Sequence, residues 1–347
     1  MFRRCGALAG IARLRKFVSA GRRNQHARRA RSPDAALAFS KRKSHVPHMP
    51  ALSRRAFFFT AASAAASLAI ADDAPEPVID IHQHTDYSGR TDEQLIAHQR
   101  RMGVTHTILL PAGRFFGLEA TCGGNARVAE IVQRLPREYS FFANEVPYLS
   151  DAREELTRWL RRGAIGIGEQ KFQLEADSRG IEIVADVARE FGVPVLLHFQ
   201  FARYNTSFDR FHKMLEKYPT VNFIGHAQTW WANIDAKAEQ AVLYPKGAVT
   251  PGGITDRLLV DYPNIFGDLS AGSGLNALRR DEDHARAFLA RHQDKLMFGS
   301  DCNDAVGEGE ACSGAQMLAT VRRLAPDRPA ERKMLFENAR RLLKLKV

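Results

Sequence analysis

The sequence predicts an α/β fold, a (β/α)8 TIM barrel with one extra helix at its C-terminal end. Eight short apolar runs alternate with eight amphipathic stretches from Val78 onward, which is the order of strands and helices in a parallel α/β protein. Five of these runs also carry side chains at or near their ends that can bind metal. A barrel gathers the carboxyl ends of its strands at one mouth, so such side chains would converge there.

The predicted strands are rich in Val, Ile, Leu and Phe and are bounded by turn residues, as buried parallel strands are. A doubly wound open sheet is the alternative, but eight regular units favour a closed barrel. The strands are expected at Val78–His84, Thr105–Pro111, Tyr139–Val146, Ala164–Lys171, Val193–Gln200, Val221–Gln228, Asn264–Ser270 and Lys295–Asp301.

Amphipathic periodicity predicts the helices between these strands, and glycine or proline closes many of them. The final helix, Pro329–Leu345, is expected to pack on the outside or to plug the bottom of the barrel. The long connection Thr229–Gly253 is expected to act as a lid or specificity element. The other helices are predicted at Asp92–Met102, Asn125–Leu135, Asp151–Arg162, Arg179–Phe191, Phe208–Tyr218, Ile254–Tyr262, Leu275–His292 and Gly314–Leu324.

The sequence predicts two units, a basic leader at residues 1–71 and the barrel at residues 72–347. Residues 1–48 contain 13 Lys or Arg and one acid, Asp34, which gives +12. The whole chain carries +11, so the remainder carries 11 − 12 = −1. The high isoelectric point therefore gives no indication of a nucleic-acid surface on the folded part. A basic nucleic-acid-binding arm is the alternative interpretation of the leader.

The end of the leader resembles an export signal. The segment S-R-R-A-F-F, residues 53–58, is similar to the twin-arginine motif, and an Ala-rich stretch follows it and ends in A-I-A at Ala71. This order predicts export by the twin-arginine machinery to the periplasm or another extracytoplasmic compartment of a bacterium. A mitochondrial presequence fits the Arg content but not this order. The stretch is too short and too weakly apolar for a stable membrane span, and Met49 offers an alternative start.

The candidate metal ligands lie at strand ends. Residues two apart on a strand face the same side, so His82 and His84 are expected to point together into the barrel, with Asp80 one layer below. Neutral imidazole suits zinc, iron, nickel and manganese. The pattern predicts one or two divalent ions, with zinc the first expectation. The other candidate ligands end later strands: Glu169, His198, His226 and Asp301.

This ordered set of H-x-H, Glu, His, His and Asp resembles the amidohydrolase superfamily. I-D-I-H-Q-H, F-G-S-D and E-N-A-R-R-L-L are similar, more narrowly, to the branch that includes the aminocarboxymuconate-semialdehyde decarboxylase relatives. The resemblance covers Val78 to the C-terminus and implies that His82, His84 and His198 are metal ligands. It implies that Asp301 is both a ligand and the carboxylate that handles protons. His226 would bind a second metal, or polarise the substrate and stabilise a developing oxyanion.

The fourth strand leaves two candidate side chains on one face, Glu169 and Lys171. Some superfamily members bridge two metals with a carbamylated lysine, whereas TatD-like members use a glutamate in a G-E sequence. The segment I-G-E favours Glu169 as the ligand. Lys171 is then expected to hold a substrate carboxylate or phosphate, or to pair with Glu169. The related decarboxylases are mononuclear and usually lack a ligand on this strand, so ligation by Glu169 favours hydrolysis.

Softer predictions concern the substrate. Arg114 is expected to bind an anionic group, with an ordinary loop arginine as the alternative, and Trp230 to line the pocket, with lid packing as the alternative. Asp268 and Ser270 are further candidates for the lining. Cys302 and Cys312 are interpreted as free buried thiols, although a disulfide is conceivable in an oxidising compartment. His98 is interpreted as structural or solvent-facing.

These observations predict an exported metal-dependent hydrolase that cleaves an amide, lactone or ester bond in a small molecule. A bound divalent cation would activate water and polarise a carbonyl, and Asp301 would accept the proton and deliver it to the leaving group. The alternatives are a non-oxidative decarboxylase of an unsaturated or aromatic acid, and a non-catalytic metal- or ligand-binding barrel. The substrate and the oligomeric state are not predicted, because specificity lies in the loops.

Overall fold

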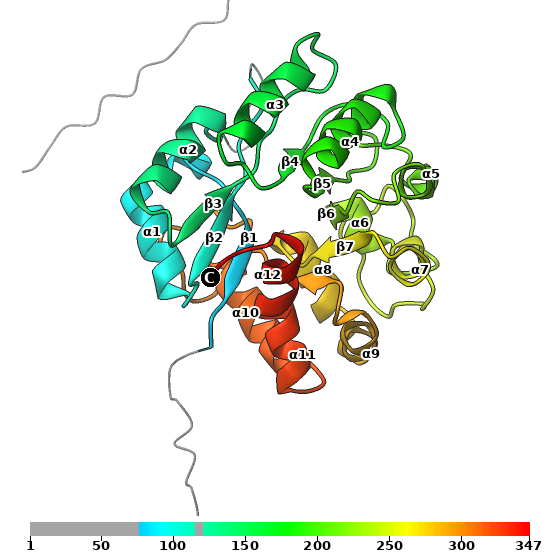
Figure 1. The fold of residues 1–347 in the computed structure, drawn as a ribbon. Helices are drawn as coiled ribbons and strands as arrows, with labels where there is room; N and C mark the ends of the chain where they lie inside the picture. Colours follow the sequence, from blue (N-terminus) through cyan, green and yellow to red (C-terminus); the bar gives the residue numbers. More distant parts are fainter. Residues whose placement is uncertain (1–75, 115–120) are drawn as a thin grey trace, which may run out of the picture. The chain divides into compact units, whose positions relative to one another are not determined.

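The computed structural model describes residues 76–114 and 121–347, and the predicted leader with its export motif lies outside the described residues. Parallel strands follow one another in sequence order around the molecule (Figure 1). Each strand lies inside the run predicted for it. The strands are β1 Ile79–Gln83, β2 His106–Leu109, β3 Tyr139–Phe141, β4 Ile167–Gln170, β5 Val195–His198, β6 Phe223–His226, β7 Ile265–Asp268 and β8 Leu296–Met297.

Backbone hydrogen bonds close the sheet into a barrel. The ladders β1-β2-β3 and β4-β5-β6-β7-β8 are joined at two seams. At the first seam, Ile165 N donates to Phe141 O at 2.9 Å, and at the second, Asp301 N donates to His82 O at 2.8 Å. The predicted fold class, a (β/α)8 barrel, is confirmed, with the helices arranged around the strands (Figure 1).

The helices follow the predicted stretches but differ from them in how some are divided. The predicted helix Leu275–His292 is two helices, because the Asp281 side chain accepts a hydrogen bond from His284 N and so starts a new helix. The long sixth connection contains an unpredicted short helix, α6 Gln228–Ala232. The remaining helices are α1 Asp92–Arg101, α2 Asn125–Arg134, α3 Ala152–Arg161, α4 Arg179–Phe191, α5 His212–Lys217, α7 Ile254–Asp261, α8 Ala271–Arg279, α9 Glu282–His292 and α10 Ser313–Leu324.

The C-terminal segment plugs the bottom of the barrel, which was one of its two predicted positions. The predicted single helix is α11 Arg328–Arg332, a π-helical turn Lys333–Glu337 and α12 Asn338–Leu342. Phe336 and Leu342 join Ile79, at the start of β1, in the inner apolar cluster. The extra C-terminal helix therefore fills the barrel end opposite the mouth.

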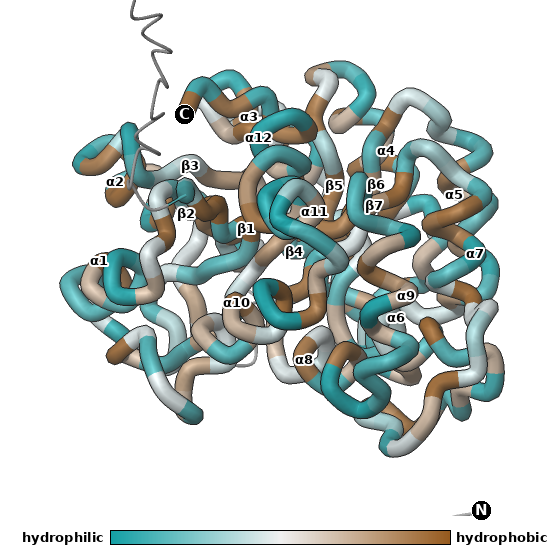
Figure 2. The backbone as a smooth tube through the Cα atoms, turned by 90° about the horizontal axis from the view of Figure 1, so that it is seen from below, coloured by the Kyte–Doolittle hydropathy of each residue, from teal (hydrophilic) through white to brown (hydrophobic). Residues whose placement is uncertain are grey.

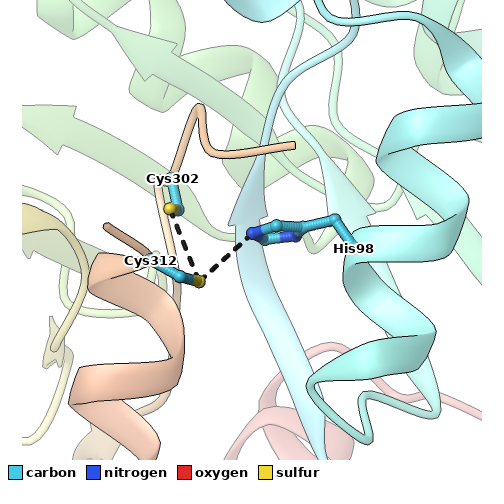
Figure 3. Close-up of side chains that lie close together, drawn as sticks. All are labelled: His98, Cys302 and Cys312. Carbon is cyan, nitrogen blue, oxygen red and sulfur yellow. Dashed lines mark hydrogen bonds between the residues drawn. The ribbon is translucent and has the colours of Figure 1, made fainter. Parts of the chain in front are cut away.

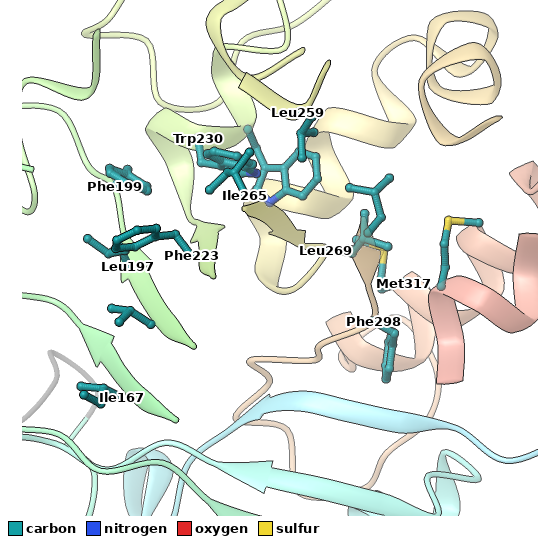
Figure 4. Packing of buried hydrophobic residues seen from close by; sticks show 14 of the residues in the cluster. Ile167, Leu197, Phe199, Phe223, Trp230, Leu259, Ile265, Leu269, Phe298 and Met317 are labelled. Carbon is teal, nitrogen blue, oxygen red and sulfur yellow. The ribbon is translucent and has the colours of Figure 1, made fainter. Parts of the chain in front are cut away.

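A larger apolar layer lies between the strands and the surrounding helices. It includes Ile167, Leu197, Phe223 and Ile265 (Figure 4). Hydrophobic residues follow the strands, whereas the outer loops are mostly hydrophilic (Figure 2).

None of the helices in residues 76–114 and 121–347 combines the length and the apolar character needed to cross a bilayer.

We expect Phe336→Ala to lower the free energy of unfolding by about 3 kcal/mol, because it removes a large buried side chain and leaves a cavity. Phe336 is only 5% exposed in the inner cluster. The measurement is denaturant unfolding followed by circular dichroism. Val260→Ala, at a position 60% exposed, is the control and should change stability by less than about 0.5 kcal/mol. Equal effects of the two variants would contradict the plugging role.

Candidate metal centre

The histidine pair of β1 reaches the barrel centre through a local irregularity of the strand. Ile81 belongs to the inner cluster, yet the next residue, His82, and His84 also face the centre. The pairing of β1 with β2 shifts register between Asp80 and Gln83, and such a bulge lets neighbouring residues face the same side. The Asp80 carboxylate accepts a hydrogen bond from Gln99 of α1 at 2.8 Å. The predicted place of Asp80 below the histidines is therefore wrong, because the strand alternation breaks.

Hydrogen bonds at Nδ1 orient three of the imidazoles. His82 Nδ1 lies 2.7 Å and His226 Nδ1 3.2 Å from the same atom, Asp268 Oδ2. His84 Nδ1 lies 2.7 Å from the carbonyl oxygen of Leu110. Carboxylate and carbonyl oxygens accept hydrogen bonds, so each Nδ1 carries the proton. All three rings therefore present Nε2 to the centre, as metal-binding histidines do.

The ligand atoms form two overlapping triads, which we call the metal centre. One triad is His82, His84 and Asp301, and the other is His82, Glu169 and His226. Nε2 of His82 lies 3.1 Å from Nε2 of His84, which lies 3.4 Å from Asp301 Oδ1. Glu169 Oε1 lies 3.6 Å from His226 Nε2. A tetrahedral zinc site with nitrogen ligands has ligand–ligand edges of about 3.3 Å, so the spacing suits a divalent ion.

One buried nitrogen atom of the centre lacks a hydrogen-bond partner among the described residues, as an atom that binds a cation would. Within the described chain, His226 Nε2 is buried and has no hydrogen-bond partner. An unpaired polar atom in the interior costs about 1–3 kcal/mol, and a cation would satisfy its lone pair. The donors are imidazole nitrogens and carboxylate oxygens, which zinc, iron, nickel and manganese accept. The residues present therefore fit a divalent metal ion.

Two buried carboxylates of the centre, Asp301 and Glu169, have lowered pKa values. Burial raises the pKa of Asp301, but the positive charge of His82 holds the pKa of that carboxyl well below its usual range. Burial also raises the pKa of Glu169, but the adjacent His198 holds it well below normal. Burial lowers the pKa of His82, but Asp301 and Asp268 together raise it well above normal. Ionised carboxylates shielded from water attract a cation to this position.

His198 lies beside the metal centre but in neither triad. Its Nδ1 is 2.5 Å from Glu169 Oε1, and its Nε2 is 3.3 Å from Gln200 Oε1. Its ring centroid lies 5.2 Å from that of His226. The structure thus brings all six predicted ligands together, and metal ligation by each of them stays a prediction.

The substrate-binding prediction for Trp230 is wrong. Its side chain is fully buried and packs against Phe199 in the outer apolar layer (Figure 4). A Cβ at Gly225 would lie 2.3 Å from the Trp230 ring, so this glycine leaves room for the indole on the outer face of β6. Helix α6 therefore turns Trp230 away from the mouth.

The two predicted cationic side chains have partners of their own. Arg114 Nε lies 2.5 Å from Glu145 Oε2, and its NH2 lies 2.7 Å from Asp151 Oδ1. Lys171 Nζ lies 5.6 Å from the centroid of the Tyr204 ring. Substrate binding by Arg114 and Lys171 stays a prediction.

Two residues of the site have roles that the sequence did not indicate. The Tyr87 hydroxyl donates a hydrogen bond to Asp301 Oδ1 at 2.9 Å. Tyr87 follows the H-x-H pair without any periodic signal. Asp268 was expected to line the pocket and instead holds two imidazoles. The sequence feature that could have indicated this role is the position of Asp268 at the end of a strand, two residues before Ser270.

Comparison with known families agrees with this geometry. The sequence model of the family described as "Amidohydrolase" matches residues 79–345. The chain belongs to the amidohydrolase family. The match spans the barrel and its C-terminal helices, which confirms the resemblance noted in the sequence. Comparison with curated protein sequences gave no match.

Solved structures share the fold of this amidohydrolase. An uncharacterised TIM-barrel protein from Bordetella bronchiseptica is 13% identical, with 77% of this chain and 98% of that chain covered and a TM-score of 0.56. A probable 2-pyrone-4,6-dicarboxylic acid hydrolase from Acinetobacter baumannii is 14% identical (77% and 99% covered, TM-score 0.53). A 2,6-dihydroxybenzoate decarboxylase from Rhizobium is 14% identical (79% and 100% covered, TM-score 0.52). At such identities the likeness concerns the fold alone.

We expect Asp268→Asn to weaken metal binding about 10- to 100-fold, because the amide cannot orient both imidazoles as the carboxylate does. Metal affinity is measured by competition with a chromophoric chelator. Asp256→Asn is the matched control, since Asp256 Oδ1 also pairs with a buried imidazole, His292 Nε2 at 2.6 Å, outside the centre. That variant should leave metal affinity unchanged. Unchanged affinity in Asp268→Asn would contradict the orienting role.

Proposed function

We propose that this protein is an exported metal-dependent hydrolase that uses a metal-activated water to cleave an amide, lactone or ester bond in a small molecule. The carrying observation is the position of Glu169 on β4. Its Oε2 lies 3.7 Å from Nε2 of both His82 and His84, and its other oxygen faces His226. A carboxylate that reaches both triads favours hydrolysis, since the related decarboxylases usually lack a ligand on this strand.

The proposed cofactor is zinc, as one or two ions. A divalent cation bound here would lower the pKa of water and polarise a carbonyl oxygen. His82, His84 and Asp301 would hold it on one side and Glu169 and His226 on the other. His198, in contact with Glu169, is the proposed sixth ligand.

Asp301 is the proposed acid–base residue. Its side chain is 13% exposed, and its Oδ2 lies 3.5 Å from His226 Nε2. The hydrogen bond from Tyr87 fixes the other oxygen, so the carboxylate is held in one orientation. A carboxylate held in this way can accept a proton from water and return it to the leaving group. His226 is proposed to polarise the substrate if it does not bind metal.

A pocket beside the centre supports a small-molecule substrate. Its volume is about 380 Å³, and it lies between the loops that follow β5 and β6. Gln200 lines it together with Phe201 and Thr229, and Gln200 also contacts His198. A pocket of this size suits a small organic molecule. Lys171 and Arg114, which are not among the residues lining this pocket, stay the proposed partners for an anionic substrate group.

We expect turnover in water labelled with oxygen-18 to place one labelled oxygen in the product, because hydrolysis adds water across the broken bond. The assay uses a panel of amides, lactones, esters and hydroxybenzoates, with mass spectrometry and carbon dioxide detection. Removal of metal should abolish turnover. Carbon dioxide release without label would establish the decarboxylase alternative, and metal binding without turnover of any substrate would favour a binding protein.

Within the same assay, Asp301→Asn should lower kcat by about 10²- to 10⁴-fold, the usual contribution of a general acid–base group. Asp261→Asn, at an exposed position of α7, is the control and should retain full activity. Full activity of Asp301→Asn would exclude the proposed proton transfer.

Export is proposed from the segment at residues 53–58. The twin-arginine route carries folded proteins, which suits a barrel that binds its metal before export. We expect Arg54→Lys combined with Arg55→Lys to retain the unprocessed chain in the cytoplasm, because the route reads the arginine pair as an address and not as charge. Fractionation and N-terminal sequencing provide the measurement, with processing near Ala71 expected in the wild type. Normal processing of the variant would contradict this route.

A further inference from the structure

We propose a second metal site, a structural zinc site formed by His98, Cys302 and Cys312 (Figure 3). His98 belongs to α1, Cys302 follows β8, and Cys312 precedes α10. Their ligand atoms all lie within 4.8 Å of one another. The three residues are 0%, 2% and 0% exposed. Structural zinc sites are closed in this way and use cysteine and histidine ligands. The site is separate from the metal centre and does not rest on the proposed hydrolysis.

The distances match zinc ligation. The two Sγ atoms lie 3.8 Å apart, and Cys312 Sγ lies 3.3 Å from His98 Nε2. Tetrahedral zinc with Zn–S of about 2.3 Å and Zn–N of about 2.0 Å has edges of about 3.8 Å between sulfurs and about 3.5 Å between sulfur and nitrogen. A disulfide requires a sulfur separation of about 2.05 Å. The predicted free thiols are confirmed, and their spacing suits a shared ion.

A hydrogen-bond chain fixes the tautomer of His98. Gln99 Nε2 donates to Asp80 Oδ2 and to Thr107 Oγ1, both at 2.8 Å. The other end of the amide, Gln99 Oε1, therefore faces His98 Nδ1 at 2.9 Å. Because Oε1 only accepts, Nδ1 carries the proton and Nε2 presents its lone pair toward Cys312. Histidine ligands of metals are held by a second hydrogen bond of this kind.

The charge of the bound ion would be balanced by its own thiolate ligands. Binding of Zn²⁺ displaces the two thiol protons to solvent, so the ion and two thiolates together are neutral. Arg90 NH1 donates at 2.9 Å to the carbonyl oxygens of both Cys302 and Asp304, which places a positive charge beside the thiolates. Asp304 Oδ2 lies 4.0 Å from His98 Nε2, so this carboxylate or a water molecule would complete four ligands.

The site would hold the loop that carries the proposed acid–base residue. Cys302 directly follows Asp301, and Cys302 O accepts a hydrogen bond from Gln83 of β1 at 2.9 Å. Zinc would tie this loop to α1 and to the start of α10. Its role is therefore structural, and its loss would loosen the position of Asp301.

The test uses metal-loaded wild-type protein. X-ray absorption at the zinc edge should show sulfur neighbours at about 2.3 Å. Replacement by cobalt(II) should give thiolate-to-cobalt charge-transfer absorption, which the nitrogen and oxygen ligands of the metal centre cannot produce. Cys302→Ser combined with Cys312→Ser should lose this absorption and one metal ion per chain. Cys122→Ser, which removes the other described cysteine, should retain both.

Two results on the wild type would overturn the proposal, and neither requires a variant to fold. One is the absence of sulfur neighbours around bound zinc. The other is thiol labelling of the denatured, metal-free protein that finds Cys302 and Cys312 joined in a disulfide. Loss of hydrolytic activity alone bears on the metal centre, so failure of the two proposals is distinguishable.

Discussion

The buried carboxylate of Asp268 is the contact on which the metal centre depends. One of its oxygens faces Nδ1 of His82 and of His226 and accepts a hydrogen bond from the Ser270 hydroxyl at 2.7 Å. Burying an ionised carboxylate costs several kcal/mol unless its oxygens are paired. Here burial raises the pKa of Asp268, but His82 and His226 hold it below its usual range. The carboxylate thus fixes two candidate ligands, His82 and His226, from strands that are far apart in sequence.

This contact exists only because the sheet is closed. Asp268 lies on β7 and His82 on β1, so the two meet across β8 and the seam at which Asp301 N donates to His82 O. An open sheet of the same strand order would leave β1 and β8 at opposite edges. The plug formed by Phe336 and Leu342 fills the other end of the same barrel. The packing at the bottom of the barrel and the site at its mouth therefore both depend on closure of the sheet.

The sequence predicted what depends on periodicity and missed what depends on packing in three dimensions. The apolar runs predicted the barrel. The polar residues at the ends of these runs predicted that the candidate ligands lie close together, because the strand ends of a barrel meet at one mouth. The bulge at Ile81 and His82 leaves no trace in an apolar run, so the outward turn of Asp80 was unpredictable. Trp230 packs against Gly225 of β6, where any larger residue would collide with the indole ring. Such pairings follow from the fold and not from local sequence.

The same bulge connects the metal centre to the Cys–His cluster. The outward-turned Asp80 accepts hydrogen bonds from His82 N at 3.0 Å and from Ser300 N at 2.9 Å. Its other oxygen accepts from Gln99, whose amide orients His98. One buried carboxylate therefore fixes the backbone of His82 and the backbone just before Asp301, and through Gln99 it also orients the ring of His98. Because a low-dielectric interior makes an unpaired member of such a network costly, a shift of the loop after β8 is opposed from both sides. The position of Asp301 is then set by the rigidity of this network as much as by its own contacts.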